Sequence, residues 1–335
     1  MTIRDVAEAS GFSKTTTAYI LNDAPNLRVT EKTRLRVLEV ARRLGYRRNA
    51  LAAALSSGRI NTFGVFLPDK MASSSGSRMY LFHKDMLTAV VGAASRAGVR
   101  IMPMLVDSDQ KVSQQEITDQ RIEGVLVTYS ASDETAVVLR ESGLPCVYLS
   151  SGPEPYVIQA DNFGGICSAV DHLVSLGHRR IVHFANEGGS SANQQRIAGF
   201  CEAMRRHGVG EPMVVISKAA VNSMLQLPVA QRPTAFTTYS DQWGVHVIDI
   251  ARENGLRVPE DISVVGFDDG PLSVMARPQL TTVHNPLDAI ADAGLTLLLS
   301  LCDKATDPVV PSPLPTHLVL RNSTAPPLVA HCPVL

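Results

Sequence analysis

Apolar residues at helical spacing form three short segments at the start of the chain. Gly11 ends the first segment, and Ser13 can cap a second that runs from residue 14 to about residue 21. Thr30 can cap a third segment that ends at Arg43, with Gly45 just beyond it. Two short helices joined by a tight turn and supported by a third helix predict a helix-turn-helix unit.

From residue 62 onward, apolar runs rich in β-forming residues alternate with helical stretches. The predicted strands cover residues 62–67, 100–106, 124–129, 146–149, 156–159, 180–184, 233–238 and 262–267. The predicted helices cover residues 82–97, 132–141, 163–176, 194–207, 241–253 and 287–301. Repeated strand–helix units predict doubly wound parallel sheets, which place binding sites at the carboxyl ends of their strands.

Length and composition are those of a globular protein of two or three domains. The chain has 335 residues, of which 45% are hydrophobic and 19% are charged. We find no apolar run of about 18 residues, the length needed for a transmembrane helix. The first residues lack the basic and apolar regions of a secretory signal. Five scattered cysteines fit a reducing compartment, so we expect a cytoplasmic protein that acts at the nucleoid.

Charge is distributed unevenly along the chain. The net charge is −1, but residues 1–60 carry 11 basic and 5 acidic residues, and the remainder is acidic. A basic head on an acidic body is expected when only the head meets the phosphates of a nucleic acid. The second predicted helix begins with small polar residues, which can reach base edges or phosphates in the major groove. The alternative is a small helical bundle with a solvated face.

Several motifs closely resemble the LacI/GalR family of bacterial repressors. In the head these are Thr2-Ile3-Arg4-Asp5-Val6-Ala7, Gly11-Phe12-Ser13-Lys14-Thr15-Thr16-Thr17, Ile20-Leu21-Asn22 and Leu44-Gly45-Tyr46. In the body they are Asp161-Asn162-Phe163-Gly164-Gly165, Leu176-Gly177-His178-Arg179-Arg180-Ile181, Arg196-Ile197-Ala198-Gly199-Phe200 and Val265-Gly266-Phe267-Asp268-Asp269. The resemblance covers nearly the whole chain.

The resemblance implies two kinds of DNA contact in the head. Lys14, Thr15 and Tyr19 occupy the positions that read bases, where Lys can donate to guanine and Thr can meet a thymine methyl group. The phosphate-anchoring positions are those of Ser13, Thr16 and Asn22. The family usually has Val-Ser where this chain has Thr17-Ala18, which removes one hydroxyl that commonly faces the DNA backbone.

The segment after the head matches the hinge helix of that family. Asn49 can cap a short alanine-rich helix, which is too short to be stable alone. The resemblance implies that this helix forms on operator DNA, contacts the minor groove through Ala52 and inserts Leu55 between base pairs. The alternative is an ordinary linker with an incidental leucine.

The resemblance also implies the domain organisation of the body. We expect a lacI-type helix-turn-helix domain over residues 1–48, a hinge helix and linker over 49–60, and an effector-binding and dimerisation domain over 61–335. The last is expected to be periplasmic-binding-protein-like, an α/β fold of two doubly wound subdomains. One subdomain would combine residues 61–160 with 287–316, and the other 161–285 with 317–330.

The cleft between these subdomains is the expected effector site. Arg196 and Asp268 match effector-holding positions, where Arg can donate a pair of hydrogen bonds and Asp can accept a pair. Further candidates are Phe82, His83, Ser150, Asn193 and Asp241. The alternative for Arg196 and Asp268 is an interdomain ion pair, and for the only tryptophan, Trp243, we favour core packing.

We therefore expect a cytoplasmic regulator of transcription, a repressor that binds a pseudo-palindromic operator as a homodimer. Its effector would be a sugar or related metabolite, with a nucleobase, a nucleoside or no effector as alternatives.

The sequence shows no catalytic motif, and His172, His178 and His183 are not at metal-ligand spacing, so we expect no catalytic residue, metal or cofactor. A transport binding protein would need a secretory signal and no basic head, and an enzyme would show turnover. The proline-containing C-terminal segment has no heptads, which favours a dimer over a tetramer.

Overall fold

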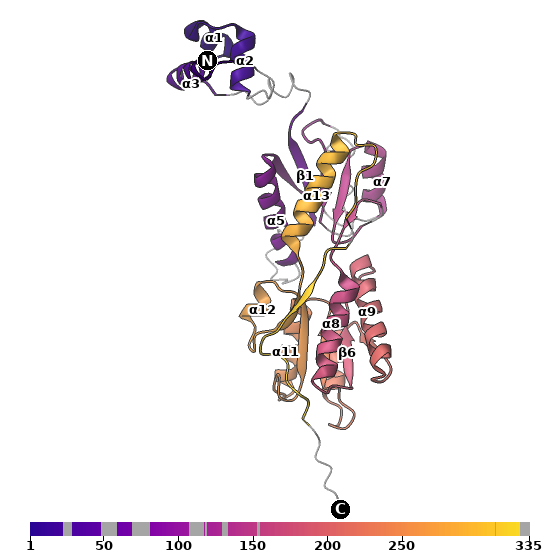
Figure 1. The fold of residues 1–335 in the computed structure, drawn as a ribbon. Coiled ribbons are helices and arrows are strands. Elements are labelled where there is room, and N and C mark those ends of the chain that lie inside the picture. Colours follow the sequence, from indigo (N-terminus) through magenta and orange to yellow (C-terminus); the bar gives the residue numbers. More distant parts are fainter. Residues whose placement is uncertain are drawn as a thin grey trace, which may run out of the picture. The chain divides into compact units, whose positions relative to one another are not determined.

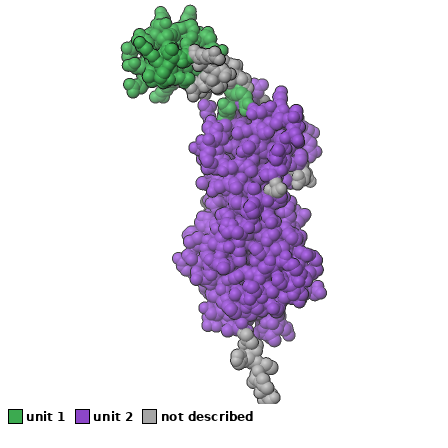
Figure 2. Space-filling view, in the orientation of Figure 1, with its two compact units in different colours: residues 1–61 green, residues 62–335 purple. Residues whose placement is uncertain are grey.

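The computed structural model describes residues 1–22, 29–47, 59–68, 81–106, 117, 119–128, 133–152, 155–311 and 313–328. The chain divides into two compact units, Met1–Asn61 and Thr62–Leu335, which Figure 2 colours green and purple. Each unit has its own hydrophobic core. None of the described helices is long and apolar enough to cross a membrane.

The first unit is a three-helix head. Its helices are α1 (Ile3–Ser10), α2 (Lys14–Leu21) and α3 (Glu31–Arg43). A capping box between Thr2 and Asp5 starts α1, and Gly11 ends it in the left-handed conformation at φ 78°. The three helices share a core of small aliphatic side chains from all of them, Val6, Ile20, Val37, Val40 and Ala41. The helix-turn-helix expectation is confirmed.

The first sheet of the body has five parallel strands in the order β2-β1-β3-β4-β5. The strands are β1 (Thr62–Pro68), β2 (Arg100–Val106), β3 (Val125–Val127), β4 (Cys146–Leu149) and β5 (Val157–Ile158). Its helices are α5 (Leu81–Ala97), α7 (Asp133–Ser142) and α13 (Leu287–Cys302). Two core clusters lie on this sheet. Helices α5 and α13 supply one of them and lie side by side in Figure 1.

The second sheet has six strands in the order β11-β10-β9-β8-β6-β7, and only β11 is antiparallel to its neighbour. The strands are β6 (Ile181–Phe184), β7 (Met213–Val215), β8 (Ala235–Thr238), β9 (Ser263–Asp268), β10 (Thr281–His284) and β11 (His317–Val319). Its helices are α8 (Asn162–Ser175), α9 (Ser191–His207), α10 (Lys218–Leu225), α11 (Asp241–Glu253) and α12 (Pro271–Met275). Helices α8 and α9 supply one core cluster, and α10 and α11 the other. Helices on both faces confirm the doubly wound architecture.

The chain passes between the two sheets three times: from β5 to α8, from β10 to α13, and from α13 back to β11. Near the third passage, Ala160 and Leu314 form an isolated β-bridge. Parallel strands end at one edge of their sheet, so the loops that follow the strands gather at that edge. This arrangement brings the carboxyl ends of both sheets to a common cavity.

Close packing of α8 against α9 depends on a glycine. A Cβ atom at Gly199 would lie 2.5 Å from the carbonyl oxygen of Phe163, which is shorter than any normal contact. Glycine therefore lets the two backbones approach one another. The contact fixes the position of α9, which carries Arg196 three residues before Gly199.

Most predicted elements occur in the structure within one or two residues of the expected bounds. The differences are short elements that the sequence analysis did not assign, β7, α10, α12, β10 and β11. Four of them have three to five residues, which is too short for a periodic pattern to identify. Of these, β10 and β11 lie at the passages between the sheets.

Candidate functional site

The start of α2 is arranged as a surface for contact. The Ser13 hydroxyl accepts a hydrogen bond from the Thr16 amide at 3.1 Å and pairs with the Thr16 hydroxyl at 2.8 Å. These two side chains therefore cap the helix. The side chains of Lys14 and Thr15 are exposed, as the major-groove interpretation requires.

The rest of α2 separates an outer from an inner face. Tyr19 is 49% exposed, whereas Thr17 is fully buried in the head. The departure of this chain from the family pattern at Thr17 therefore falls on the inner face. Asn22 follows the last residue of α2, and its backbone amide donates to the Ala18 carbonyl. The Asn22 residue is half-buried. Ala52 and Leu55, the two expected contacts of the hinge helix, lie outside the described residues.

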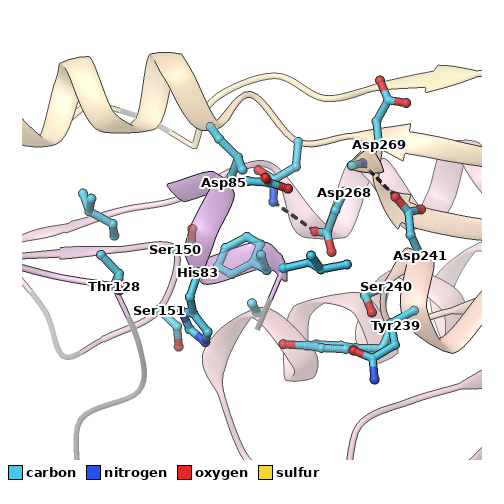
Figure 3. Close-up of a pocket in the computed structure, with 18 of the residues that line it drawn as sticks. His83, Asp85, Thr128, Ser150, Ser151, Tyr239, Ser240, Asp241, Asp268 and Asp269 are labelled. Carbon is cyan, nitrogen blue, oxygen red and sulfur yellow. Dashed lines mark hydrogen bonds between the residues drawn. The ribbon is translucent and has the colours of Figure 1, made fainter. Parts of the chain in front are cut away.

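A cavity of about 900 Å³ lies between the two sheets of the body. Residues that follow strands of the first sheet, such as Thr128 and Ser150, line one side. Residues that follow strands of the second sheet, such as Tyr239 and Asp268, line the other. Its volume is within the range of small-molecule sites, and Figure 3 shows side chains that enter it from both sides.

Arg196 lines this cavity but is held mainly by the protein. Its side chain is 5% exposed, and its Nε donates to Asn162 Oδ1 at 2.9 Å. Its Nη1 donates to the Tyr239 carbonyl, and the guanidinium lies 3.6 Å above the centre of the Phe267 ring. Nη2 is 3.8 Å from Asp268 Oδ1.

Both members of the Arg196–Asp268 pair belong to the second sheet and its helices, since Arg196 is on α9 and Asp268 ends β9. The alternative of an interdomain ion pair therefore does not apply, since the two side chains approach each other within one subdomain. An effector contact by both residues stays a prediction. The lining residues of the other subdomain come from α5, from the start of α13 and from the ends of β1, β3 and β4.

Asp268 projects into the cavity from a strained turn. Its φ is 111°, a region that side-chain-bearing residues rarely adopt. Its carboxylate accepts a hydrogen bond from Asn285 Nδ2 at 3.3 Å. Burial raises the pKa of Asp268 to about 6, against the opposing effects of Arg196 and Asn285. The group therefore changes protonation close to neutral pH.

Asp241 is buried in the wall of the cavity. One carboxylate oxygen accepts from the Thr282 hydroxyl at 2.5 Å. The other accepts from the Gly270 amide at 2.8 Å, and this hydrogen bond is the dashed line at Asp241 in Figure 3. Burial, and then the negative charge of Asp268, raise the pKa of Asp241 well above its usual value. Asp241 thus fixes the turn between β9 and α12, and its side chain is 97% removed from water.

The first sheet contributes Phe82, His83 and Ser150, as expected from the sequence. The rings of Phe82 and His83 meet edge to face at 5.5 Å. Burial lowers the pKa of His83 to about 4, while a hydrogen bond to the Thr128 backbone opposes the shift, so the ring is neutral at pH 7. His83 Nδ1 and Ser150 Oγ are buried without a hydrogen-bond partner in the described part of the chain.

Asn193 was expected in the cavity, and this assignment requires correction. Its Oδ1 accepts from the Asn186 amide at 3.2 Å, and its Nδ2 donates to the carbonyls of Asn186 and Gly188. All of these contacts brace the loop before α9. Among the described residues, those that line the cavity include Asn186 and Gly188 but not Asn193. The sequence identified the correct helix end but not the direction of the side chain.

Several lining residues were missed or misassigned from the sequence, among them Trp243, Asp85 and Asn285. Trp243 lines the cavity while it also contacts Tyr239 edge to face at 5.8 Å, so the expected core packing is only part of its environment. Asp85 and Asn285 also line the cavity, and no sequence motif pointed to them. Asn285 follows β10, a strand that was not predicted, and Asp85 lies one turn into α5.

Asp268 and Asp269 have different environments although they are adjacent. Asp269 contacts the side chains of Arg321 and His284, and Figure 3 shows its carboxylate turned away from Asp268. Such a pair does not hold one substrate atom between two carboxylates. The described residues also contain no cluster of three or more His, Cys, Asp or Glu side chains that could hold a metal ion.

A helix-turn-helix head joined to a two-sheet body with a cavity between the sheets defines a DNA-binding regulator of transcription. Residues 2–49 match the family described as bacterial regulatory proteins, lacI family. Residues 170–324 match the periplasmic binding protein-like domain. Together with the relatives below, these matches show that the chain belongs to the LacI family.

The relatives are similar over nearly their whole length. The chain is 30% identical to the HTH-type transcriptional regulator DegA of Bacillus subtilis, over 97% of this chain and 98% of that protein. It is 28% identical to catabolite control protein A of Priestia megaterium, over 97% and 99% of the two chains. A crystal structure of the Lac repressor dimer bound to operator and the anti-inducer ONPF is 26% identical, with a TM-score of 0.76 over 97% and 99%. The first of these relatives is named as a transcriptional regulator and the last as a repressor bound to its operator.

Proposed function

We propose that this regulator binds a pseudo-palindromic operator as a homodimer, in the cytoplasm at the nucleoid, and that a small molecule in the cavity controls its operator affinity. The proposal rests on one observation above all. The cavity between the two sheets is lined by polar groups from both sides, and several of their buried atoms have no partner among the described residues. A ligand that pairs with them removes a desolvation cost and draws the two sheets together.

The head supplies the DNA contacts in this proposal. Lys14, Thr15 and Tyr19 read bases, and Ser13, Thr16 and Asn22 contact phosphates. The exposure of Lys14, Thr15 and Tyr19 supports the first group. The hydroxyls of Ser13 and Thr16 already pair with each other, so a phosphate contact by either must share that hydrogen bond.

The segment after the head carries the ligand signal to the DNA. We propose a helix-turn-helix domain over residues 1–48, a hinge over 49–60 and an effector domain over 61–335. Its subdomains would be residues 61–160 with 287–316, and 161–285 with 317–330. Ala52 and Leu55 of the hinge contact the minor groove, and Leu55 bends the DNA by unstacking a base step. Ligand binding changes the spacing of the two hinges of a dimer, with a coupling of about 1–3 kcal/mol.

The experiment measures operator binding with and without ligand. Binding sites are first selected from random DNA with the purified protein, and fluorescence anisotropy then follows one selected duplex. A panel of sugars, amino sugars, sugar acids, sugar phosphates and nucleosides is added, and a true effector shifts the Kd for DNA about fivefold or more. Ser150→Ala removes only the unpartnered hydroxyl and should weaken the effect of the ligand. Ser175→Ala, a hydroxyl on α8 outside the cavity lining, is the matched control.

Two outcomes contradict this proposal. If no palindromic site is selected, the mode of DNA binding is wrong. If a site is selected but no member of the panel changes its Kd, control by a ligand in the cavity is wrong. Lys14→Ala in the same selection should change the preferred bases, and a uniform loss of affinity across sequences would make Lys14 a phosphate contact instead.

A further inference from the structure

The charged groups of the cavity are almost all negative. One positively charged side chain, that of Arg196, lines it among the described residues, together with five carboxylates. The five are those of Asp85, Asp241, Asp268, Asp269 and Asp288. Asp269 is paired with Arg321, and Asp241 accepts two hydrogen bonds from its own subdomain. Asp288 is exposed at the start of α13, so Asp85 and Asp268 remain as the half-buried carboxylates that a ligand can reach.

Asp85 and Asp268 approach each other from opposite sides of the cavity. Asp85 projects from α5, which packs on the first sheet, and Asp268 ends β9 of the second sheet (Figure 3). A Cβ atom at Gly270 would lie 3.4 Å from Asp85 Oδ2, so the Asp85 carboxylate meets the turn that follows Asp268. No hydrogen bond or ion pair holds Asp85 within the ranges that the structure describes. Asp268 has Arg196 of its own subdomain at 3.8 Å, whereas Asp85, on the other side, has no cationic partner among the described residues.

Arg196 cannot serve as a free anion-binding group. Its Nε and Nη1 already donate to Asn162 and Tyr239. The guanidinium stacks on the Phe267 ring, and the remaining nitrogen, Nη2, faces Asp268. A phosphate or carboxylate in the cavity would meet Asp85 and Asp268, and the described lining residues offer no unengaged cation to offset the repulsion. The lining thus disfavours sugar phosphates, sugar acids and nucleotides.

Several uncharged polar atoms of the cavity can accept hydrogen bonds from a ligand. Asn285 is 4% exposed and donates to Asp268 through Nδ2, but its Oδ1 has no partner in the described chain. His83 Nδ1, on a ring that is neutral at pH 7, is likewise an open acceptor. Ser150 Oγ can accept as well. Hydroxyl groups of a ligand satisfy these positions, and Trp243 and Tyr239 offer aromatic surface to its apolar face.

We propose, on the basis of the function proposed above, that the effector is an amine-bearing, hydroxyl-rich small molecule whose ammonium group lies between Asp85 and Asp268. An amino sugar or an amino polyol has this chemistry. The ammonium makes charge-assisted hydrogen bonds to a carboxylate on each side, and its hydroxyls donate to Asn285 and His83. Because the two carboxylates belong to different sheets, the ligand replaces repulsion across the cavity with attraction and favours closure.

A neutral polyol fits these observations less well. It can donate to the open acceptors, but it leaves Asp85 and Asp268 facing each other as buried like charges. An ammonium group offsets both carboxylates. Burial raises the pKa of Asp85 as it does that of Asp268, and the charge of Arg196 only partly offsets the shift at Asp268.

Isothermal titration calorimetry at pH 7.5 tests this proposal with matched ligands. D-glucosamine and D-galactosamine are compared with their N-acetyl forms, with D-glucose and D-galactose, and with glucose 6-phosphate and glucuronate. We expect an amine to bind about tenfold or more tightly than its N-acetyl and hydroxyl counterparts, and the anions to bind weakest. Asp85→Asn should reduce amine affinity by about tenfold, and the affinity for neutral sugars by less than about threefold.

Asp288→Asn is the matched control because Asp288 lines the same cavity from an exposed position at the start of α13. It should change amine affinity by less than about threefold, and thermal unfolding should show that both variants fold. If a neutral or anionic ligand binds as tightly as any amine, or Asp85→Asn leaves amine binding unchanged, the amine proposal is overturned while the effector site stands. If no ligand in the panel binds, both proposals fail.

Discussion

At the scale of single residues, the cavity differs from a stable protein core because it holds polar groups without partners. Asp268 combines a left-handed backbone at φ 111° with a side chain that is only 15% exposed. Both features cost free energy of folding, and strain of this kind collects where a ligand is bound. The same residue matches a family motif that implies an effector contact, so the motif and the strain point to one position.

Replacement of Asp268 by Asn should stabilise the ligand-free body at neutral pH. Burial raises its pKa from 3.8 to about 6, so the folded protein holds the proton more tightly than the unfolded chain. The stabilising contribution of that proton is fully present below about pH 3.8 and is lost as pH rises through about 6. Asn has no such loss, so the advantage of Asp268→Asn should grow by about 2 kcal/mol between pH 4 and pH 7.5.

Urea unfolding of wild-type protein and Asp268→Asn at several pH values measures this difference. Asp171→Asn is the control, because Asp171 forms exposed ion pairs with Arg206 and His207. A difference that does not change with pH would show that Asp268 is not a buried, titrating carboxyl group.

The residue scale also shows the limit of sequence analysis. Arg196, Asp268, His83 and Ser150 were found because they lie at the ends of predicted elements in recognisable motifs. Asp85 was missed because it meets Asp268 only across the cavity, and Asn285 because it meets Asp268 only from a neighbouring strand end, and no local pattern records such contacts. Asn193 was misassigned because the sequence cannot show that its amide turns back onto its own loop.

At the scale of elements, the packing of α8 against α9 positions the second side of the cavity. Long periodic helices and buried strands were predicted because hydrophobic spacing dictates them. The short strands β7, β10 and β11 were missed because three or four residues carry no period, and they form only by adding to strands that already exist. The sequence therefore predicted the fold class, but it did not predict the short strands at the passages between the sheets.

Gly199→Ala should destabilise the body through this helix pair. The added methyl group would lie 2.5 Å from the Phe163 carbonyl oxygen, and a backbone atom cannot move aside without shifting α8. We expect a loss of about 1–3 kcal/mol, the usual cost of overpacking. Differential scanning calorimetry measures it, with Gly189→Ala as control because a Cβ at Gly189 would meet no atom within 4 Å. Equal stability of the two variants would contradict the close approach.

At the scale of the whole molecule, the head and the body have separate cores of very different size. The head is stabilised by one cluster of five buried apolar residues, whereas the body has four clusters on two sheets. Small domains bury a smaller fraction of their surface and are less stable. The basic charge of the first 60 residues adds repulsion within the head until DNA phosphates offset it.

We therefore expect two thermal transitions in the full chain. The head should unfold first with a small enthalpy, and the body should unfold at a higher temperature. Operator DNA should raise mainly the lower transition and a cavity ligand the upper one, because each stabilises only the unit that it binds. Differential scanning calorimetry with each addition provides the measurement. A single transition that both additions shift together would show that the two units fold as one.

The three passages of the chain between the sheets also restrict how the body can respond to a ligand. A single connection would let the two subdomains rotate relative to each other about any axis. Three connections resist a twist of one subdomain against the other and leave hinge bending as the easier motion. Under the proposed function, a ligand in the cavity would therefore move the two subdomains mainly in one direction. With one direction of motion available, the bound and the empty protein would differ only in whether the two subdomains are closer together or further apart.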